Sequence, residues 1–578
     1  MTEIQKPVTG RLLSVMSAQW PKILMALLCA VVSSLSAIFA TLYLGYAIDA
    51  MVGQGDVDFP GLHRIILILG GLYLAGALFQ WFVSVLANQI AHGTSQTLRH
   101  LTFEKLGRLP LSFFDQTSRG DLVSRFTNDL DSVSLALSLS IVSLFTGAVV
   151  VVTSLIFMLS LNVQITLVIL LCTPVIFLVA WIISRFTQET YRRQQAVVGE
   201  LSGFVSEIVG NQRLVTAFGY ESRSVERFEA ITARLKVTGT KAHFASALFN
   251  PITRFVDHLT YLLVGVVGGL IALGGVSVGT VSSFLIYSAQ FAKPFNEISG
   301  VLGNIQTAFA SLRRIFEILD TPEESAEAPN MPELGHPQGA VEFRNVDFSY
   351  SSSRPLIQDL NLKVTPGSLV AIVGPTGAGK TTIVNLLMRF YELNKGALLI
   401  DGRNVSGVTR NSLRRSFGMV LQDTWLFEGT IRDNIAYGKP NATQQEVEEA
   451  ARFAHAHSFI KRLPQQYDTM LTQDGGNLSQ GQKQLLTIAR VMLTNPAMLI
   501  LDEATSSIDT LTEIRIQKAF LKMMEGRTSF VIAHRLSTIT SADVILVLDK
   551  GKIIETGTHN ELLEKGGFYA QLYASQFQ

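Results

Sequence analysis

The sequence predicts a polytopic α-helical membrane domain fused to an α/β domain. First, 48% of the 578 residues are hydrophobic and 16% are charged, and the mean hydropathy of +0.32 is too apolar for an ordinary soluble chain. Second, the apolar runs that are long enough to span a bilayer lie in the first half of the chain. Third, a glycine-rich turn follows an apolar strand-like run at residues 370–382. A chain of this length is expected to form more than one domain.

Six apolar runs in the N-terminal half predict six membrane-spanning helices. The segment before the first run is short, polar and lightly basic, and no small-residue cleavage site follows that run, so we interpret it as a retained membrane helix. The last run is the weakest, because it contains several polar side chains. The predicted spans are Ile23–Ala47, Ile65–Ala91, Val133–Leu161, Ile165–Ser184, Val256–Leu273 and Val276–Ala292.

The charges of the loops predict the orientation of these spans. Asp49–Arg64 is rich in aspartate, whereas Gly93–Ser132 and Gln188–Asn250 are rich in arginine and lysine. Basic loops stay in the cytoplasm, so both termini and the two long loops are expected on that side. Both long loops are helix-compatible and read as membrane helices that continue beyond the bilayer. We expect them to turn at Ser112–Gly120 and Arg213–Glu221.

Two polar clusters near the predicted inner ends of the spans allow two interpretations. Asp257 and His258 begin the fifth span, and Asn88, Gln89 and His92 lie near the end of the second. Polar groups in a bilayer mark either a substrate or proton path or a hydrogen bond between helices. We favour helix–helix hydrogen bonds, or a position below the hydrocarbon, because both clusters lie near cytoplasmic ends.

A composition change near residue 320 predicts the domain boundary. Lys293–Asp320 continues the last span with apolar residues at helical spacing, and Thr321–Gly339 then breaks the pattern with prolines and glutamates. We therefore predict a transmembrane domain at 1–320, a linker at 321–339 and a nucleotide-binding domain at 340–578. In the last region, apolar runs alternate with helix-compatible runs, which is typical of an α/β fold.

The stretch Val370–Thr382, VAIVGPTGAGKTT, fits the phosphate-loop pattern G-x-x-x-x-G-K-[ST]. A strand, a loop without side-chain bulk and a helix start direct backbone N–H groups and the helix dipole at one anion. Lys380 is expected to reach the outer phosphates and the Thr381 hydroxyl to ligate Mg²⁺. The residues predicted to contact the nucleotide here are Gly374, Pro375, Thr376, Gly377, Ala378, Gly379, Lys380, Thr381 and Thr382.

A second acidic motif follows about 120 residues later, at Met498–Glu503 (MLILDE). An apolar strand brings Asp502 to its C-terminal end, where ligands bind in such sheets and where a carboxylate can hold Mg²⁺. Glu503 is placed to orient or deprotonate the attacking water. A strand ending in Asp-Glu is common alone, but together with the phosphate loop it predicts nucleotide hydrolysis.

Four further residues fit the same chemistry. Gln422 follows a strand-like run and is predicted to touch Mg²⁺ and the water, and His534 is predicted to contact the γ-phosphate. Asp509 lies on the loop after Glu503, and Tyr350 is expected to stack on adenine. Alone, the histidine would better be interpreted as a core residue, and a lone tyrosine would also more often belong to the core.

The segment Leu478–Gln482 reads LSQGQ and precedes a helix-compatible run. A turn of this kind at a helix start is a second anion site, which Ser479, Gly481 and Gln482 would form. Because the domain already has one phosphate loop, we interpret this second site as serving another chain's nucleotide.

Taken together, these motifs identify the chain as resembling a half-transporter of the ATP-binding cassette (ABC) exporters, of the bacterial multidrug type. The matching motifs are GPTGAGKT, LQD at Leu421–Asp423, LSQGQ, MLILDE, SSID and IAHR, and Phe113–Val133 is similar to the first intracellular loop of these exporters. The resemblance implies a type I exporter fold with six transmembrane helices and a P-loop ATPase domain. It also implies a dimer with two ATP molecules between the cassettes, each bound by one chain's phosphate loop and the other's LSQGQ segment, and coupling helices at the loop tips. The second tip would contact the partner's cassette.

Two departures from the family pattern bear on the partner. Gln480 replaces the second small residue of the usual LSGGQ, and Thr472–Asn477 lacks the glutamate that many members carry there. The segment is similar to one chain of heterodimeric exporters, in which one composite site is impaired. Glu503 and His534 are retained, so this chain's own site is expected to be the competent one. We therefore favour a heterodimer with a distinct chain over a homodimer.

The leading functional hypothesis is ATP-driven efflux of amphipathic or hydrophobic compounds across the cell (inner) membrane, with ATP and Mg²⁺ as cofactors. A lipid or glycolipid flippase is the alternative within the fold, and a nucleotide-gated channel or regulatory subunit is the alternative of another class. A near-neutral net charge of +1 argues against a nucleic-acid partner. Glu503 argues against the channel, because gating alone needs no hydrolysis. The expected partners are a second half-transporter chain, membrane lipid and a small amphipathic substrate.

Overall fold

The computed structural model describes residues 7–51, 57–351, 355–421, 424–472, 475–502, 509–533 and 536–577. The chain forms two compact units. The first comprises Met1–Leu109 and Thr117–Pro322, and the second comprises Pro110–Gln116 and Glu323–Gln578. The short segment Pro110–Gln116, which we place in the transmembrane domain on sequence, therefore packs with the C-terminal half of the chain.

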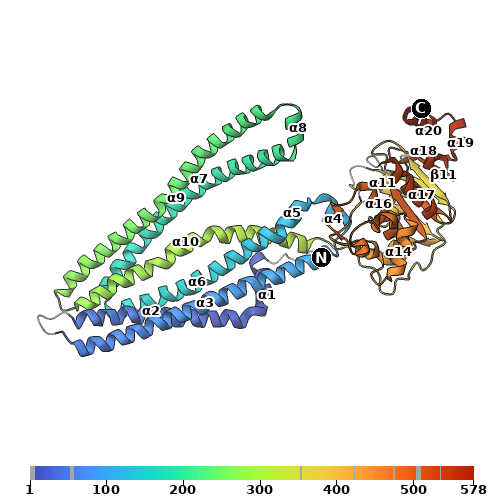
Figure 1. Cartoon of the computed structure of the whole chain (residues 1–578). Coiled ribbons are helices and arrows are strands. Elements are labelled where there is room, and N and C mark those ends of the chain that lie inside the picture. Colours follow the sequence, from blue (N-terminus) through green and yellow to red (C-terminus); the bar gives the residue numbers. More distant parts are fainter. Residues whose placement is uncertain are drawn as a thin grey trace. The chain divides into compact units, whose positions relative to one another are not determined.

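The first unit consists of helices, several of them far longer than a bilayer is thick (Figure 1). Helix α2 packs along α3, α6 along α10, and α7 along α9. Helix α8 lies at the turn between α7 and α9, inside the second predicted tip. The helices are α1 (Val8–Met16), α2 (Trp20–Asp49), α3 (Phe59–Leu106), α5 (Arg119–Ser124), α6 (Leu130–Leu161), α7 (Val163–Gly210), α8 (Gln212–Ala217), α9 (Glu221–Ala272) and α10 (Val278–Asp320).

Among the described residues, four helical stretches have the length and hydropathy of a membrane span: Val8–Asp49, Phe59–Leu106, Arg119–Leu161 and Glu221–Ala272. They contain the first, second, third and fifth predicted spans. The fourth prediction falls in α7, whose part Val163–Val175 forms a shorter apolar helix, and the sixth falls in α10. The total of six spans therefore remains a prediction at these two positions.

The polar cluster at the end of the second predicted span makes hydrogen bonds between helices. Ser138 of α6 donates to Asn88 Oδ1 at 2.6 Å, and the hydroxyl of Ser134 lies 3.3 Å from His92 Nδ1. Both pairs join α3 to α6, as the simpler interpretation expects. Asp257 of α9 differs, because its Oδ1 is buried and has no hydrogen-bond partner among the described residues.

The second unit is an α/β fold in which, over the described residues, a six-stranded sheet has the order β12-β11-β3-β10-β9-β6. A four-stranded antiparallel sheet, β2-β1-β4-β5, and a short pair, β7-β8, accompany it. The strands are β1 (Val341–Phe348), β2 (Ile357–Val364), β3 (Leu369–Val373), β4 (Lys395–Ile400), β5 (Arg403–Asn404), β6 (Phe417–Val420), β7 (Gly429–Thr430), β8 (Met470–Leu471), β9 (Met498–Asp502), β10 (Thr528–Ile532), β11 (Val544–Asp549) and β12 (Lys552–Gly557).

Most helices of this unit lie in the connections between its strands, whereas α4 precedes the first strand and α19 and α20 follow the last (Figure 1). Thr321–Ala340 runs without helix or strand between α10 and β1, all of it within the described residues. The helices are α4 (Leu111–Gln116), α11 (Lys380–Leu387), α12 (Arg410–Arg415), α13 (Ile431–Ile435), α14 (Gln444–Phe453), α15 (His457–Ile460), α16 (Gln480–Thr494), α17 (Thr510–Met524), α18 (Leu536–Thr540), α19 (His559–Glu564) and α20 (Phe568–Phe577).

The six-stranded sheet is buried on both faces, so its central strands read as continuous apolar runs. Along β3, Ala371 and Val373 belong to one apolar cluster, whereas Val370 and Ile372 belong to the other. Strands β9, β10 and β11 divide their side chains between the same two clusters. The sheet is therefore a rigid support on which loops at its edge can be held in place.

Candidate functional site

Four neighbouring strands bring the predicted motifs to one edge of the sheet. Strands β3, β10, β9 and β6 are adjacent and parallel, and Ile532 of β10 lies opposite both Ile372 of β3 and Asp502 of β9. On the other side of β9, Leu501 lies opposite Val420 of β6. The C-terminal ends of these strands thus lie level, at the edge where α/β sheets bind their ligands.

The phosphate loop joins β3 to α11 with a backbone that glycine favours. Gly374, Gly377 and Gly379 have φ angles of +152°, +83° and +103°, in the region that other residues rarely adopt. A Cβ at Gly374 would lie 2.2 Å from the carbonyl oxygen of Leu548, so the loop also packs too closely for a side chain there. The carbonyl of Ala378 accepts a hydrogen bond from Gly551 N at 3.1 Å, which ties the loop to the turn after β11.

Lys380 lies across this loop at the start of α11. Its ammonium donates to the backbone oxygens of Gly374, at 2.6 Å, and Pro375, at 3.1 Å. Burial lowers the pKa of Lys380, and the negative charge of Asp502 opposes that shift. A cation that burial disfavours, beside a helix start and N–H groups, is suited to a multivalent anion.

The residues present fit a hydrated divalent cation beside that anion. Thr381 has a hydroxyl in the first turn of α11, and Asp502 has a carboxylate at the end of β9. The negative charge of this carboxylate acts on the pKa of Lys380. Hydroxyl and carboxylate oxygens are the ligands that Mg²⁺ prefers alongside phosphate oxygens. When bound, such an ion would neutralise phosphate charge during transfer.

Tyr350 lies beside the phosphate-loop helix. Its hydroxyl accepts a hydrogen bond from Asn385 Nδ2 at 2.9 Å and donates to Thr382 Oγ1 at 3.4 Å, and both partners belong to α11. The residue is 46% exposed, so part of it is accessible to a ligand. The structure therefore brings this predicted adenine-contacting residue together with the phosphate loop.

Three predicted catalytic residues, Glu503, His534 and Gln422, lie outside the described residues. Each of them directly follows the last residue of a described segment: Asp502, Ala533 and Leu421, respectively. Their roles therefore stay predictions.

The second predicted anion site lies at the start of α16. Ser479 is the N-cap, and it forms a reciprocal capping box with Gln482: Gln482 N donates to Ser479 Oγ at 3.3 Å, and Ser479 N donates to Gln482 Oε1 at 3.0 Å. Gly481 is buried within the first turn. Gln480 donates from Nε2 to Thr424 Oγ1 at 3.2 Å, so this departure from the family pattern ties α16 to the segment after β6.

Asp509 serves as a helix cap in the isolated chain. It is the N-cap of α17, and its carboxylate accepts a hydrogen bond from Thr512 N at 2.9 Å. That hydrogen bond lowers the pKa of Asp509. The structure places this predicted nucleotide contact at a helix start, where its carboxylate is already engaged locally.

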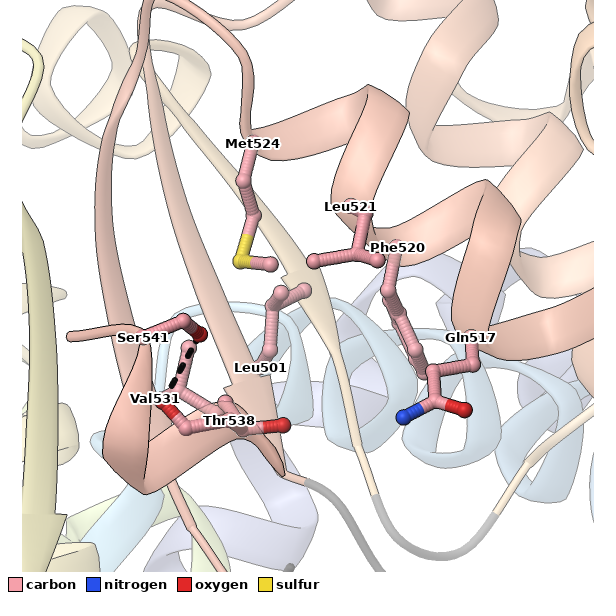
Figure 2. A pocket seen from close by; sticks show the side chains of 8 residues that line it. All are labelled: Leu501, Gln517, Phe520, Leu521, Met524, Val531, Thr538 and Ser541. Atoms are coloured by element: carbon pink, nitrogen blue, oxygen red, sulfur yellow. Dashed lines mark hydrogen bonds between the residues drawn. The ribbon is translucent and has the colours of Figure 1, made fainter. Parts of the chain in front are cut away.

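An apolar cavity of about 170 Å³ lies beneath the acidic strand, and Figure 2 shows its lining. Its lining is mostly aliphatic and aromatic, with a hydrogen bond from Ser541 Oγ to the Thr538 carbonyl at 3.3 Å. None of the described residues that line it is cationic, so a triphosphate is better matched by the phosphate loop. The lining residues are Leu501, Gln517, Phe520, Leu521, Met524, Val531, Thr538 and Ser541.

Comparison with known proteins adds to this geometry. Residues 23–295 match the family described as the ABC transporter transmembrane region, and residues 357–506 match the ABC transporter family. A fatty acid ABC transporter ATP-binding/permease protein of Mycobacterium tuberculosis is 45% identical over 92% of this chain and 84% of its own length. An ATP-dependent lipid A-core flippase of Hahella chejuensis is 36% identical over 99% of this chain and 97% of its own length.

The chain belongs to the ABC exporters. A solved structure, that of a bacterial Atm1-family ABC exporter with ATP bound, is 30% identical to this chain with a TM-score of 0.78. The match covers 98% of this chain and 99% of the chain in that structure. This ABC exporter chain is thus a membrane protein that binds ATP and couples its hydrolysis to transport. Half-transporters of this kind function as dimers.

Some residues around the site of this exporter chain belong to no sequence motif, so the sequence analysis missed them. Asn385 holds the Tyr350 hydroxyl, and Tyr391 packs edge-on against the Tyr350 ring with centroids 4.8 Å apart. The available sequence signal is weak: an aromatic pair, Phe390 and Tyr391, stands directly after the phosphate-loop helix. Periodicity cannot identify such contacts, because they depend on which strands become neighbours.

We expect Gly374→Ala to weaken ATP binding about tenfold or more, since backbone strain of this kind costs about 1–3 kcal/mol. The added Cβ would meet the Leu548 carbonyl at 2.2 Å, and the φ of +152° is unfavourable for alanine. Calorimetric titration with ATP measures the affinity, and thermal unfolding measures stability. Gly407→Ala is the control, because a Cβ there has no atom within 4 Å and the φ is not positive. Equal ATP affinity in wild type and Gly374→Ala would contradict the prediction.

Proposed function

We propose that this chain is half of an exporter that moves amphipathic or hydrophobic compounds out of the cell, powered by ATP bound at Lys380 and Asp502. The observation that carries this proposal is a phosphate loop beside an acidic strand end, on a chain whose other half is apolar helices. The basic loops favour the cell (inner) membrane with both termini and the ATPase domain on the cytoplasmic side.

Within this proposal, an acyl-chain lipid is the alternative that a specific observation favours over multidrug compounds. Two of the relatives are named for fatty acids and for lipid A-core. Long-chain amphiphiles also suit apolar helices with scattered Ser and Thr hydroxyls. We therefore separate two candidate functions: efflux of diverse hydrophobic compounds and movement of lipids between leaflets.

Reconstitution into liposomes distinguishes these functions. Oleate, a cationic rhodamine dye and a fluorescent phospholipid serve as the probes, and ATP hydrolysis and probe movement are measured together. Movement of the dye supports multidrug efflux, whereas movement of oleate or phospholipid alone supports the lipid alternative. ATP hydrolysis without movement of any probe would contradict both.

We further propose that Mg²⁺ binds with ATP at Thr381 and Asp502, with Gln422 as a third contact. Thr381 lies in the first turn of α11, which follows β3, and Asp502 ends β9, which only β10 separates from β3 in the sheet. The charge of Asp502 acts on Lys380, the residue before Thr381. Glu503 and His534 are proposed to act on the attacking water and the γ-phosphate, and Asp509 to lie near the nucleotide in the assembled dimer.

A second chain is proposed to complete the assembly. The turn around α8 exposes large apolar side chains, with Phe218 78% and Val209 68% exposed, and such a patch favours a protein partner. The α16 start, with Ser479 as its cap, would face the partner's nucleotide. Gln480 supports a distinct partner chain, because a bulky amide replaces a small residue in that site.

We expect the purified chain alone to hydrolyse ATP about tenfold or more slowly than its natural assembly, since a missing transition-state donor costs at least that much. Gln480→Gly should raise the activity of the chain alone, because it restores the small residue. ATPase assays on size-fractionated protein measure both. Gln444→Gly, an exposed position at the start of α14, is the control. Dimers of the unmodified chain with stimulated activity would contradict the heterodimer and support a homodimer.

A further inference from the structure

Four residues just after the phosphate-loop helix, Arg389–Glu392, connect to both segments through which the chain enters its second unit: directly to one, and through Arg410 and Arg414 to the other. The chain enters that unit twice, at Pro110–Gln116 and again at Glu323. The contacts described below all lie inside this unit. They connect one short segment, which continues directly from α11, to both points of entry.

The first connection runs through Tyr391. Its ring packs against Tyr350, with centroids 4.8 Å apart, and against Phe348, at 5.7 Å. Its hydroxyl donates a hydrogen bond to Asp115 Oδ2 in α4, a residue 276 positions earlier in the chain. Burial raises the pKa of Tyr391, and the carboxylate of Asp115 raises it further, so the hydroxyl keeps its proton and remains a donor.

The second connection runs through Glu392 and Arg410. The Arg410 side chain is 7% exposed and donates from Nη2 to Glu392 Oε1 at 2.7 Å. The same guanidinium donates from Nη1 to the Ser325 carbonyl at 2.7 Å, and its Nε lies 3.3 Å from Glu324 Oε1. One buried arginine thus joins the end of the α11 segment to the start of the linker.

The segment itself is held rigidly. Arg389 is buried, and its backbone adopts the left-handed conformation with a φ of +48°. Its Nε donates a hydrogen bond to Glu392 Oε1 at 3.0 Å. Its Nη1 donates to the carbonyls of Val405 and Val408, at 2.9 and 3.1 Å. Arg414 Nη2 bridges the Arg389 carbonyl, at 3.1 Å, and Glu324 Oε1, at 2.8 Å. Hydrogen bonds of this kind between charged and backbone groups hold the segment in a defined geometry relative to its neighbours.

We propose that Arg389–Glu392 transmits nucleotide binding from α11 to both entry segments: through Tyr391 and Asp115 to α4, and through Glu392 and Arg410 to the linker. Tyr391 and Glu392 are positioning residues, since they act through other groups. The inference rests on ATP binding at the phosphate loop and not on the transported substrate. Failure of transport therefore leaves its test intact.

Hydrogen–deuterium exchange on the full-length protein, with and without a non-hydrolysable ATP analogue, tests the proposal. In the unmodified protein the analogue should slow amide exchange in both Leu111–Gln116 and Glu323–Glu327 by about fivefold or more. Tyr391→Phe keeps the ring but loses the hydroxyl, so the response of α4 should disappear while that of the linker remains. Glu392→Gln should leave the response of α4 intact and reduce that of the linker, which Arg414 still connects to the Arg389 carbonyl.

Tyr467→Phe is the matched control, because it also removes a tyrosine hydroxyl engaged by another side chain; this hydroxyl lies 2.7 Å from His457 Nδ1. It should leave both responses intact. Asp115→Asn replaces Tyr391→Phe if that variant does not fold, as judged by its thermal midpoint, and should give the same loss in α4. The proposal is overturned if the unmodified protein shows no response, or if each variant leaves both responses unchanged or reduces both equally.

Discussion

Changing Lys380 to methionine should lower ATP hydrolysis by about a hundredfold or more and should end transport with it. The methionine keeps an unbranched side chain, one atom shorter than that of lysine, and removes the charge that lies against the phosphate loop. No other cation is held by the loop carbonyls of Gly374 and Pro375 among the described residues. Steady-state ATPase assays on the reconstituted assembly measure the change, and ATP titration separates lost binding from lost chemistry.

The same variant should remain folded without nucleotide. Burial lowers the pKa of Lys380, which means that the folded state disfavours the charged ammonium relative to the unfolded chain. This lowers the free energy of unfolding of the unmodified protein, and the loss becomes smaller as pH rises from the lowered folded pKa to the ordinary value. Methionine has no charge, so the variant does not lose stability in this way. Lys439→Met is the control, because Lys439 is a surface lysine paired with Glu446 at 2.6 Å and is expected to matter little. Normal ATP turnover in Lys380→Met would contradict the proposed nucleotide site.

Changing Glu503 to glutamine should reduce ATP turnover by about a hundredfold or more while ATP binding persists. Glutamine keeps the shape of the side chain but cannot accept the proton of the attacking water. Asp502, which ends β9 directly before it, is left intact in this variant. Retained binding with lost turnover, measured by ATP titration and phosphate release, is the expected result.

This variant also separates the exporter from the channel. A nucleotide-gated channel would still conduct with ATP bound, whereas an exporter would stop moving its substrate after one closure. Glu564→Gln, in an exposed position of α19, is the control for losing one carboxylate from the domain. Undiminished hydrolysis in Glu503→Gln would assign the role of general base to another residue.

Much of this site could be predicted because its signals are local. The phosphate loop is recognised from glycines that must adopt positive φ, and the structure has Gly374, Gly377 and Gly379 in that region. The acidic strand is recognised from an apolar run that ends in Asp502. Both depend on backbone geometry within a few residues, so no knowledge of the fold is needed.

Other features could not be read from the chain. Asp509 is a helix cap in the single chain, and Gln480 reaches Thr424, 56 positions away. The capping partner of Asp509, Thr512, is only three positions away, so that contact is local. The partner of Gln480 could not be identified from sequence, because it is chosen by the packing of elements that are distant along the chain.

By itself, the sequence determined the two kinds of domain, the apolar spans and the phosphate-binding chemistry of this protein, since hydrophobic periodicity and glycine conformation act over short stretches. The family resemblance implied that the tip near Pro110–Gln116 contacts the cassette, but only the tertiary structure decided that Tyr391 bonds to Asp115 across 276 positions. It also decided that the buried guanidinium of Arg410 joins Glu392 to the linker. The physical reason is that a hydrogen bond between residues distant along the chain forms only where the fold brings donor and acceptor together, and no local pattern in the sequence records that contact.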